Sequence, residues 1–393
     1  MLSPAMLKVS LNRRLPFGPI FVRPVRPFVR PSAVRPLRPQ FVRFARGRIG
    51  RSSGSIIVDG FELIATPSAR RASLVTSFPA VDQKARRKES TPVALHQYTE
   101  DPTLAWEMLK DRRPVKPVRP MRLDTPVKPD HVRFVCIGCT HGEPFDLTKL
   151  PPGDVLLVAG DFTSCGLPNE VAHFNKLLGK LKYPYKVVIG GNHECTFDPA
   201  FLKNNKESDP REIALKQALL SAIHADSKHG ISAKNLLSNA IYLEDHAIEL
   251  FGITIYGTPW QPKVDNWAFN LKRGQPLLDK WNNIPTGVDV LLTHTPPLGH
   301  GDMMNNGQRM GCVELLNTVI KRVNPKYHVF GHIHEGYGCT TDGYTKFINC
   351  CLCDENLDMK NAPVIFDIPV AAQTKAFYLE NVKKMVKRYK PKK

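Results

Sequence analysis

The sequence lacks the features that place a chain in a membrane or on a secretory route. It has no run of 18 apolar residues, which argues against a transmembrane helix. Arg and Pro interrupt every apolar stretch near the start, which argues against a secretory signal segment. The nine cysteines stand at scattered spacings, and their odd number does not suit a closed disulfide framework. We therefore expect free thiols in a reducing compartment, with the cytoplasm as the first choice.

Acidic residues are absent from the first 58 positions, where eleven Arg and one Lys carry +12 of the net charge of +19. Residues 129–393 hold 30 basic and 27 acidic side chains, and seven of the basic ones lie between Lys383 and Lys393. The body is thus nearly neutral, and the positive charge belongs to the two ends. This distribution does not indicate a nucleic-acid-binding fold, although the basic arm suits an acidic partner.

The N-terminal segment is of low complexity. Within residues 16–43 the triplet Val-Arg-Pro recurs, and proline at every third or fourth position prevents a helix. We expect residues 1–90 to form a disordered basic arm. An acid-free, Arg-rich start is also typical of a mitochondrial transit peptide, so mitochondria are the alternative location. Residues 91–130, with five prolines from Pro114 to Pro129, are expected to be a linker or an arm packed on the body.

From residue 131 onward, apolar runs alternate with amphipathic stretches of helical period, centred near Phe174, Leu219 and Leu316. This alternation predicts an α/β body over residues 131–370, followed by a basic tail at 371–393. The expected strands are the apolar runs at 131–138, 154–160, 186–190, 247–256, 288–293, 326–331 and 344–350.

Five polar clusters each follow an apolar run. Because ligands in open α/β sheets bind beyond the carboxyl ends of the strands, the clusters should converge. Residues two apart on a strand point the same way, so Cys139 with His141, and His332 with His334, should each aim two donors into one space. Together the clusters offer the ligands of a pair of divalent transition metals. They are Cys139-Thr140-His141, Gly160-Asp161, Gly191-Asn192-His193-Glu194, His294 and Gly331-His332-Ile333-His334.

Each cluster has a plainer structural interpretation when it is taken alone. Asp161 could cap the turn that follows it, and Asn192 could occupy a left-handed turn. His294 could be a satisfied histidine at a strand end. Cys136, Cys350 and Cys351 are interpreted as small apolar residues, because they lie in or at the end of apolar runs. A separate structural zinc site is the weaker alternative, because the cysteines have no finger-like ligand spacing.

The order of the five clusters resembles that of the calcineurin-like metallophosphoesterases. Members of that family carry Asp-x-His, Gly-Asp, Gly-Asn-His-Asp/Glu, a lone His and Gly-His-x-His. Longer matches, among them Gly257-Thr258-Pro259-Trp260-Gln261-Pro262 and Phe330-Gly331-His332-Ile333-His334-Glu335, are similar to the animal subgroup called metallophosphoesterase domain-containing proteins. The resemblance runs from about His131 to Pro369 and leaves out the N-terminal third.

The resemblance implies two packed mixed β-sheets flanked by helices, a four-layer sandwich with two metal ions at one sheet edge. It also implies a hydrolase that cleaves a phosphodiester by attack of a metal-bridging hydroxide, with a cyclic nucleotide as one candidate substrate. His193 would contact the phosphate and help the leaving oxygen depart, with Asp161 and Asn192 beside it. Arg309 is the nearest cationic candidate for a phosphate contact. The implied metal ligands are Cys139, His141, Asp161, Asn192, His294, His332 and His334.

Within that pattern Asp161 would bridge the two ions, His334 would serve site 1 and His332 would serve site 2. Cys139 departs from the pattern, because the family has Asp there. A thiolate is a softer ligand than a carboxylate and must first lose a proton, from a pKa of about 8.5. Site 1 would then favour Zn or Fe over Mn.

Two other classes of function stay open. A weakened site 1 would leave a metal- or nucleotide-binding regulator on the same fold. A basic-tailed adaptor would use residues 1–58 to bind an acidic partner.

Overall fold

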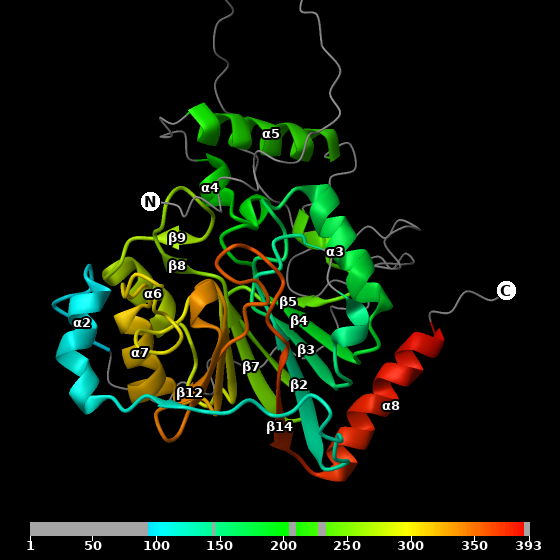
Figure 1. The fold of residues 1–393 in the computed structure, drawn as a ribbon. Coiled ribbons are helices and arrows are strands. Elements are labelled where there is room, and N and C mark those ends of the chain that lie inside the picture. Colours follow the sequence, from blue (N-terminus) through cyan, green and yellow to red (C-terminus); the bar gives the residue numbers. More distant parts are fainter. Residues whose placement is uncertain (1–92, 144–145, 204–209, 227–232, 389–393) are drawn as a thin grey trace, which may run out of the picture.

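The computed structural model describes residues 93–143, 146–203, 210–226 and 233–388. The disorder expected for residues 1–90 lies outside the described residues, as does the tail beyond residue 388. Two β-sheets pack face to face, and helices cover their outer faces (Figure 1). No helix in the described ranges combines the length and the apolar character that crossing a membrane requires.

The first sheet has five strands in the order β14-β2-β3-β4-β5, of which β2 to β5 are parallel and β14 is antiparallel to β2. Side chains of β2 alternate between the two faces of this sheet: Phe134 and Cys136 face the second sheet, while Val135 and Ile137 face the helices. The strands are β14 (Val364–Pro369), β2 (His131–Ile137), β3 (Val155–Val158), β4 (Tyr185–Val188) and β5 (Ile241–Tyr242).

The second sheet has seven strands in the order β1-β12-β13-β11-β10-β7-β6. Its centre, from β13 to β7, is parallel, and the outer pairs are antiparallel. A separate pair is formed by β8 (Gln261–Pro262) and β9 (Asn270–Leu271). The strands of the large sheet are β1 (Lys116–Pro117), β12 (Gly338–Thr341), β13 (Lys346–Asn349), β11 (Tyr327–Phe330), β10 (Val290–Thr293), β7 (Ile253–Thr258) and β6 (His246–Leu250).

Helices form the two outer layers. Helix α3 (Pro168–Lys180) buries Phe174 and Leu178 against the first sheet. Helices α6 (Gln275–Asn282) and α7 (Val313–Thr318) cover the second sheet, where Trp281 and Leu315 pack in one cluster. The other helices are α2 (Pro102–Leu109), α4 (Pro199–Lys203), α5 (Pro210–Asp226) and α8 (Ala372–Arg388). The order helix, sheet, sheet, helix confirms the predicted four-layer α/β sandwich.

Two sequence predictions differ from the structure. The run 247–256 is not one strand but the hairpin of β6 and β7, because Phe251 and Gly252 both take positive φ, of 58° and 75°, and reverse the chain. The tail expected from residue 371 begins as helix α8. Its Tyr378, Leu379 and Val382 pack on the core between the sheets.

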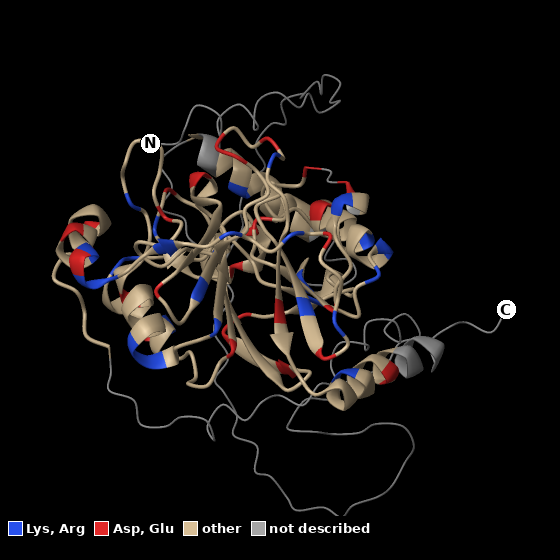
Figure 2. Ribbon diagram, turned by 60° about the horizontal axis from the view of Figure 1, so that its bottom comes forward, with Lys and Arg blue, Asp and Glu red and all other residues tan. Residues whose placement is uncertain are grey.

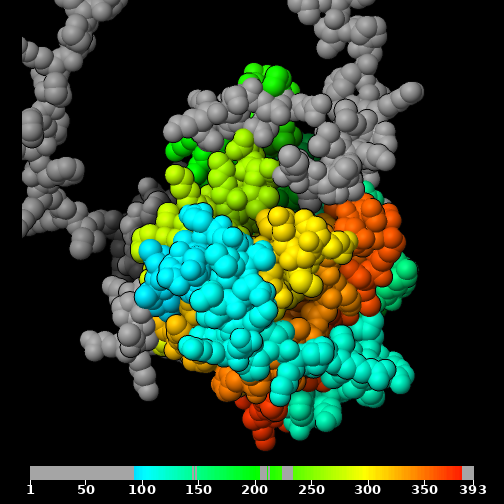
Figure 3. All heavy atoms as spheres, turned by 60° about the vertical axis from the view of Figure 1, so that its left-hand side comes forward, coloured from blue at the N-terminus to red at the C-terminus, as the bar shows by residue number. Residues whose placement is uncertain are grey.

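A strap formed by residues 93–117 crosses the outside of the second sheet (Figures 1 and 3). In it, helix α2 buries Trp106 against Leu298 and Leu316. Gly299 makes this contact possible, since a Cβ at that position would lie 2.1 Å from the Trp106 ring. The strap therefore braces the loop that follows β10.

Charges of both signs are interspersed over the described ribbon and gather in no single region (Figure 2). One buried group of charges joins helix α8 to the first sheet. Lys375 pairs with Asp154 at 2.8 Å, and its Nζ also donates to the carbonyl oxygen of His131 at 2.6 Å. Arg133 lies nearby in the same strand as His131 and pairs with Asp367 of β14 at 2.8 Å.

We predict that Trp106→Ala lowers the free energy of unfolding by about 3–5 kcal/mol, because it empties a packed site under α2. The exposed Met108, on the same helix, is the matched control. Met108→Ala should change the free energy of unfolding by less than about 0.5 kcal/mol. Urea unfolding followed by circular dichroism measures both. Equal effects of the two substitutions would show that α2 does not pack in this way.

Candidate metal centre

The five polar clusters meet at one edge of the sandwich. Each begins where a parallel strand stops: β2, β3 and β4 in the first sheet, and β10 and β11 in the second. Because the carboxyl ends of parallel strands share an edge, side chains nearly 200 residues apart, such as His141 and His334, come into contact.

The backbone, not the pleat of a strand, aims these side chains. Cys139 and His141 both have a φ of 48°, Asp161 has 52° and His332 has 70°. The expectation that the paired residues point the same way because they lie two apart on a strand is therefore wrong: all of these residues lie beyond the strand ends. Left-handed backbone at a non-glycine residue costs about 1–3 kcal/mol and is concentrated at functional sites. Here the backbone N–H groups of Thr140 and His141 both donate to the carbonyl oxygen of Asp161, at 2.9 and 2.8 Å, which locks the two loops together.

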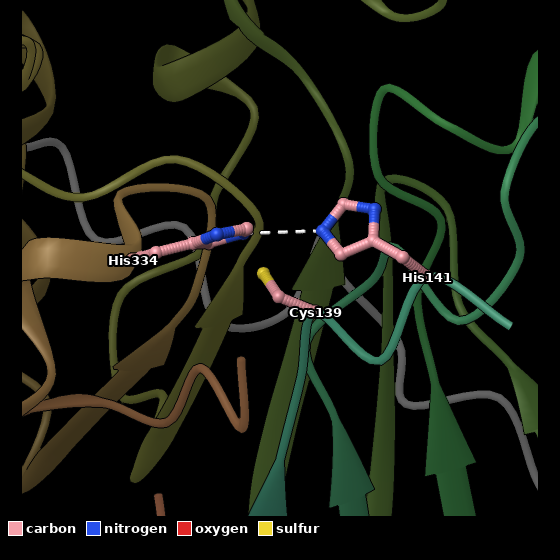
Figure 4. Close-up of side chains that lie close together, drawn as sticks. All are labelled: Cys139, His141 and His334. Carbon is pink, nitrogen blue, oxygen red and sulfur yellow. Dashed lines mark hydrogen bonds between the residues drawn. The ribbon is translucent and has the colours of Figure 1, made fainter. Parts of the chain in front are cut away.

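Among the described residues, three groups of donor atoms lie within 4.8 Å of one another. The first consists of Cys139, His141 and His334 (Figure 4). The Nε2 atoms of the two histidines lie 3.1 Å apart, with the Cys139 sulfur beside them. The His334 Nδ1 lies 3.0 Å from the carbonyl oxygen of Asp354, so it carries the ring proton and leaves the Nε2 lone pair for a ligand.

The second group consists of Asp161, His294 and His332. The His294 Nε2 lies 3.2 Å from Asp161 Oδ2 and 2.9 Å from the amide oxygen of Asn192. The His294 Nδ1 donates to the carbonyl oxygen of Ala159 at 2.8 Å and fixes the ring. Asn192 therefore joins this group through its oxygen, the atom of its side chain that can bind a cation.

The third group, His141, Asp161 and His193, links the other two. The His193 Nδ1 donates to the carbonyl oxygen of Ser164 at 2.7 Å, and its ring stacks on Trp267 with centroids 4.3 Å apart. The backbone N–H of His193 also donates to Asp161 Oδ1 at 2.9 Å. Asp161 thus lies at the centre of the whole set.

Glu194 is the residue that the sequence analysis did not assign. Its buried carboxylate accepts four bonds: from the N–H groups of Asp161 at 2.8 Å, Thr163 at 3.0 Å and Gly191 at 2.6 Å, and from the Thr163 hydroxyl at 2.8 Å. It does not pair with His193. The carboxylate joins the loop after β3 to the loop after β4, and so sets the position of Asp161 relative to Asn192. The Glu at the end of Gly191-Asn192-His193-Glu194 was a visible signal for this role.

Close packing around Asp161 explains the glycines in the motifs. A Cβ at Gly191 would lie 2.3 Å from Asp161 Oδ1. A Cβ at Gly331 would lie 2.9 Å from the Cys139 sulfur. Only glycine allows these two backbones to pass so near the donor atoms.

The electrostatics of the set favour anionic oxygen and sulfur ligands. Burial works against ionisation of Asp161, but the surrounding histidines, His294 first, hold its pKa well below the ordinary value. Burial likewise opposes the Cys139 thiolate, yet contacts with Cys351, His141 and His334 hold the pKa of Cys139 well below its ordinary value. Burial lowers the pKa of His193 to about 4 and that of His332 to about 3, so both rings are neutral at pH 7.

These residues fit a divalent transition metal. Two imidazole nitrogens 3.1 Å apart have at most one proton between them to share, and a cation satisfies both lone pairs. The set combines thiolate, imidazole, carboxylate and amide oxygen, and it is buried, so the charge of Asp161 calls for a positive partner. His334 falls in the first group and His332 in the second, as site 1 and site 2 were expected to divide them; the ligand roles themselves stay a prediction.

Arg309 has other partners than a substrate. Its Nη1 pairs with the buried Asp302 at 2.5 Å, and its guanidinium lies over Trp106, 4.6 Å from the ring centroid. These contacts argue against the expected phosphate contact and instead tie Arg309 to the strap.

Cys351 is a second residue whose setting the sequence analysis missed. It was interpreted as an apolar filler at a strand end, but its sulfur lies 3.3 Å from that of Cys139. Cys350, next to it, points elsewhere and contacts the carbonyl oxygen of Phe330 at 3.3 Å. The spacing of the cysteines gave no sign of this contact, because the two lie 212 residues apart.

Comparisons with known proteins agree with the geometry. The sequence profile of the family described as calcineurin-like phosphoesterase matches residues 132–336. The chain is 75% identical over 398 residues to a UPF0046 protein of Caenorhabditis elegans, with 100% of both chains covered. It is 45% identical over 288 residues to the human metallophosphoesterase domain-containing protein 1, covering 70% of this chain and 85% of the relative. The chain, whose buried histidines, carboxylate and thiol converge at one sheet edge, belongs to the calcineurin-like phosphoesterase family, as its motifs predicted.

Proposed function

We propose that this protein hydrolyses a phosphodiester with the help of two divalent metal ions. One observation carries the proposal: Asp161 lies within 4.8 Å of donor atoms on both sides, His141 and His193 in one group and His294 and His332 in the other. A carboxylate that stands between two groups of donor atoms is the arrangement that a pair of ions requires.

The residues divide between the two ions around that carboxylate. Cys139, His141 and His334 would hold the first ion, Asn192, His294 and His332 the second, and Asp161 would bridge them. Such a pair acts as a Lewis acid toward a phosphoryl group and supplies a nucleophile from water at neutral pH. The sulfur of Cys139 favours Zn or Fe over Mn at the first position, because a thiolate is a soft ligand.

His193 and Asn192 would work on the substrate. The Nδ1–H of His193 is engaged by the Ser164 carbonyl oxygen, so the other ring nitrogen is the one that meets a phosphate oxygen. A bound phosphate anion favours the charged ring, which can then donate a proton to the leaving oxygen. The Trp267 ring restricts the orientation of His193. The NH₂ group of Asn192 would be the complementary donor to the phosphoryl oxygens, because its carbonyl oxygen, which lies 2.9 Å from His294 Nε2, would be available to the second ion.

The family and the buried, cationic character expected of the loaded site support a phosphate ester as the substrate class. The proposed substrate is a small phosphodiester, with a cyclic nucleotide as one candidate. The proposed location of the protein is the cytoplasm. A second candidate function, a weakened metal- or nucleotide-binding regulator, is favoured by one observation: the residue at position 139 is a buried thiol in contact with a second thiol, not a carboxylate.

We predict that the purified protein contains zinc or iron and hydrolyses bis(p-nitrophenyl) phosphate. Treatment with a chelator should abolish turnover, and added Zn or Fe should restore it better than Mn. Elemental analysis and colorimetric rates measure the two properties. A metal-loaded protein without turnover on any phosphodiester would favour the regulator instead.

We predict that His193→Ala lowers kcat by about 10²-fold or more while the metal content stays the same, because its role is on the phosphate. Asp161→Ala should instead empty the site, since it removes the ligand shared by both ions. Elemental analysis next to the rates separates the two cases. Loss of metal from the His193 variant would overturn the division of roles.

We predict that Cys139→Asp shifts the metal preference from Zn toward Mn and raises turnover with Mn, because a hard ligand replaces a soft one. Cys136→Ala, three residues earlier in β2, is the matched control and should keep the wild-type preference. Titration with each metal, followed by rates, measures both. An unchanged preference in Cys139→Asp would show that Cys139 is not a ligand.

A further inference from the structure

Two thiols meet at the first donor group, and the proposed hydrolysis uses only one of them. Cys139 and Cys351 have no exposed surface, and their sulfurs lie 3.3 Å apart, with the Cys351 thiol donating to Cys139. Cys351 stands outside the donor group of Cys139, His141 and His334. Its position beside a ligand sulfur calls for another role.

The backbone holds these thiols in a pairing suited to a covalent bond. Cys351 is bridged in parallel to Gly138, the neighbour of Cys139, and the N–H of Cys353 donates to the carbonyl oxygen of Cys139 at 3.3 Å. Paired chains run about 4.8 Å apart, and disulfides accept Cα separations of about 4.4–6.8 Å. Gly331 leaves the space around both sulfurs, since its Cβ would lie 2.9 Å from Cys139 and 3.6 Å from Cys351.

We propose that Cys139 and Cys351 form a reversible disulfide, and that the disulfide and the metal of the first site exclude each other. The proposal rests on the proposed function in one respect, the role of Cys139 as a ligand. A sulfur bonded to a second sulfur has lost the negative charge with which it would bind the ion. Oxidation would therefore release the first ion, and a bound ion would protect the thiol.

The chemistry balances with a peroxide as oxidant. The Cys139 thiolate attacks one oxygen of hydrogen peroxide, the O–O bond breaks, and the sulfenic acid and hydroxide form. The Cys351 sulfur then attacks the Cys139 sulfur, the S–O bond breaks, and water leaves with the Cys351 proton. Two thiols lose two electrons and two protons, and one peroxide becomes two waters. A small oxidant would enter past His332, the partly exposed member of the donor groups.

Peptide mapping by mass spectrometry tests the pairing on the full-length protein. Metal-free and zinc-loaded samples are treated with hydrogen peroxide, and the remaining thiols are alkylated before digestion. We expect a peptide linked through Cys139 and Cys351 in the metal-free sample, strong suppression of it by zinc, and its loss after treatment with dithiothreitol. The peroxide-treated protein should also lose zinc-binding capacity, and dithiothreitol should restore that capacity.

Two neighbouring variants sharpen the test. Cys351→Ala keeps the ligand sulfur, so it should bind zinc, but peroxide should then give no linked peptide and leave Cys139 as a sulfenic acid that dimedone traps. Cys350→Ala, the matched control, should behave like the wild type, because its sulfur faces the Phe330 carbonyl oxygen. Circular dichroism checks the folding of both, and the wild-type peptide map stands without either variant.

Two results would overturn the inference. One is the absence of the linked peptide in the metal-free wild type while other cysteines oxidise. The other is its formation at the same rate with zinc fully bound. Failure of the proposed hydrolysis is read separately: a protein that forms the linked peptide under zinc control but turns over no phosphodiester loses the enzymatic role and keeps the disulfide.

Discussion

The arrangement of the candidate metal centre depends on the hydrogen bonds that the Glu194 carboxylate accepts. Four donors from the loops after β3 and β4 converge on its two oxygens, and none of them belongs to a regular strand or helix. A buried carboxylate without such partners would be costly, and burial together with the neighbouring Asp161 raises the pKa of Glu194. The donors of the two loops therefore stabilise the buried carboxylate, and the carboxylate in turn fixes the two loops relative to each other. The positions of Asp161, Thr163 and Gly191 therefore depend on this one carboxylate.

The sequence predicted that the donor residues converge at one sheet edge. It did not predict why their side chains point toward one another. The apolar runs at 131–138, 154–160, 288–293 and 326–331 were predicted as strands, and parallel pairing brings the residues at their carboxyl ends to one shared edge. The φ values that aim Cys139, His141 and His332 depend on tertiary hydrogen bonds across loops. No local pattern contains that information. The family resemblance carried the assignment where periodicity could not.

Contacts between distant segments account for the other differences. Strand β14 was not among the predicted strands. It lies more than 200 residues after its partner β2 in the sequence, and its six residues alone look like any short apolar run. The contact of Cys351 with Cys139 depends on the bridge beyond the end of β13, so the cysteine spacing could not reveal it. Helix α8 was not predicted because basic residues dominate the composition of residues 371–393, whereas Tyr378 and Leu379 of this helix pack against the core. The number of charged residues in a segment does not show which of its apolar residues pack against the core.

The strap contacts segments that are synthesised much later than the strap itself. The N–H of His96 donates to Glu314, 218 residues later, and the N–H of Arg309 donates to the hydroxyl of Thr103, 206 residues earlier. The strap is synthesised first and ends in β1, yet the surface that receives Trp106 exists only after Leu298 and Leu316 have left the ribosome. Contacts of such long sequence separation form slowly. Trp106 can therefore reach its final contacts only after the loop that follows β10 and helix α7 have been synthesised, so the segment that braces this loop waits for most of the chain.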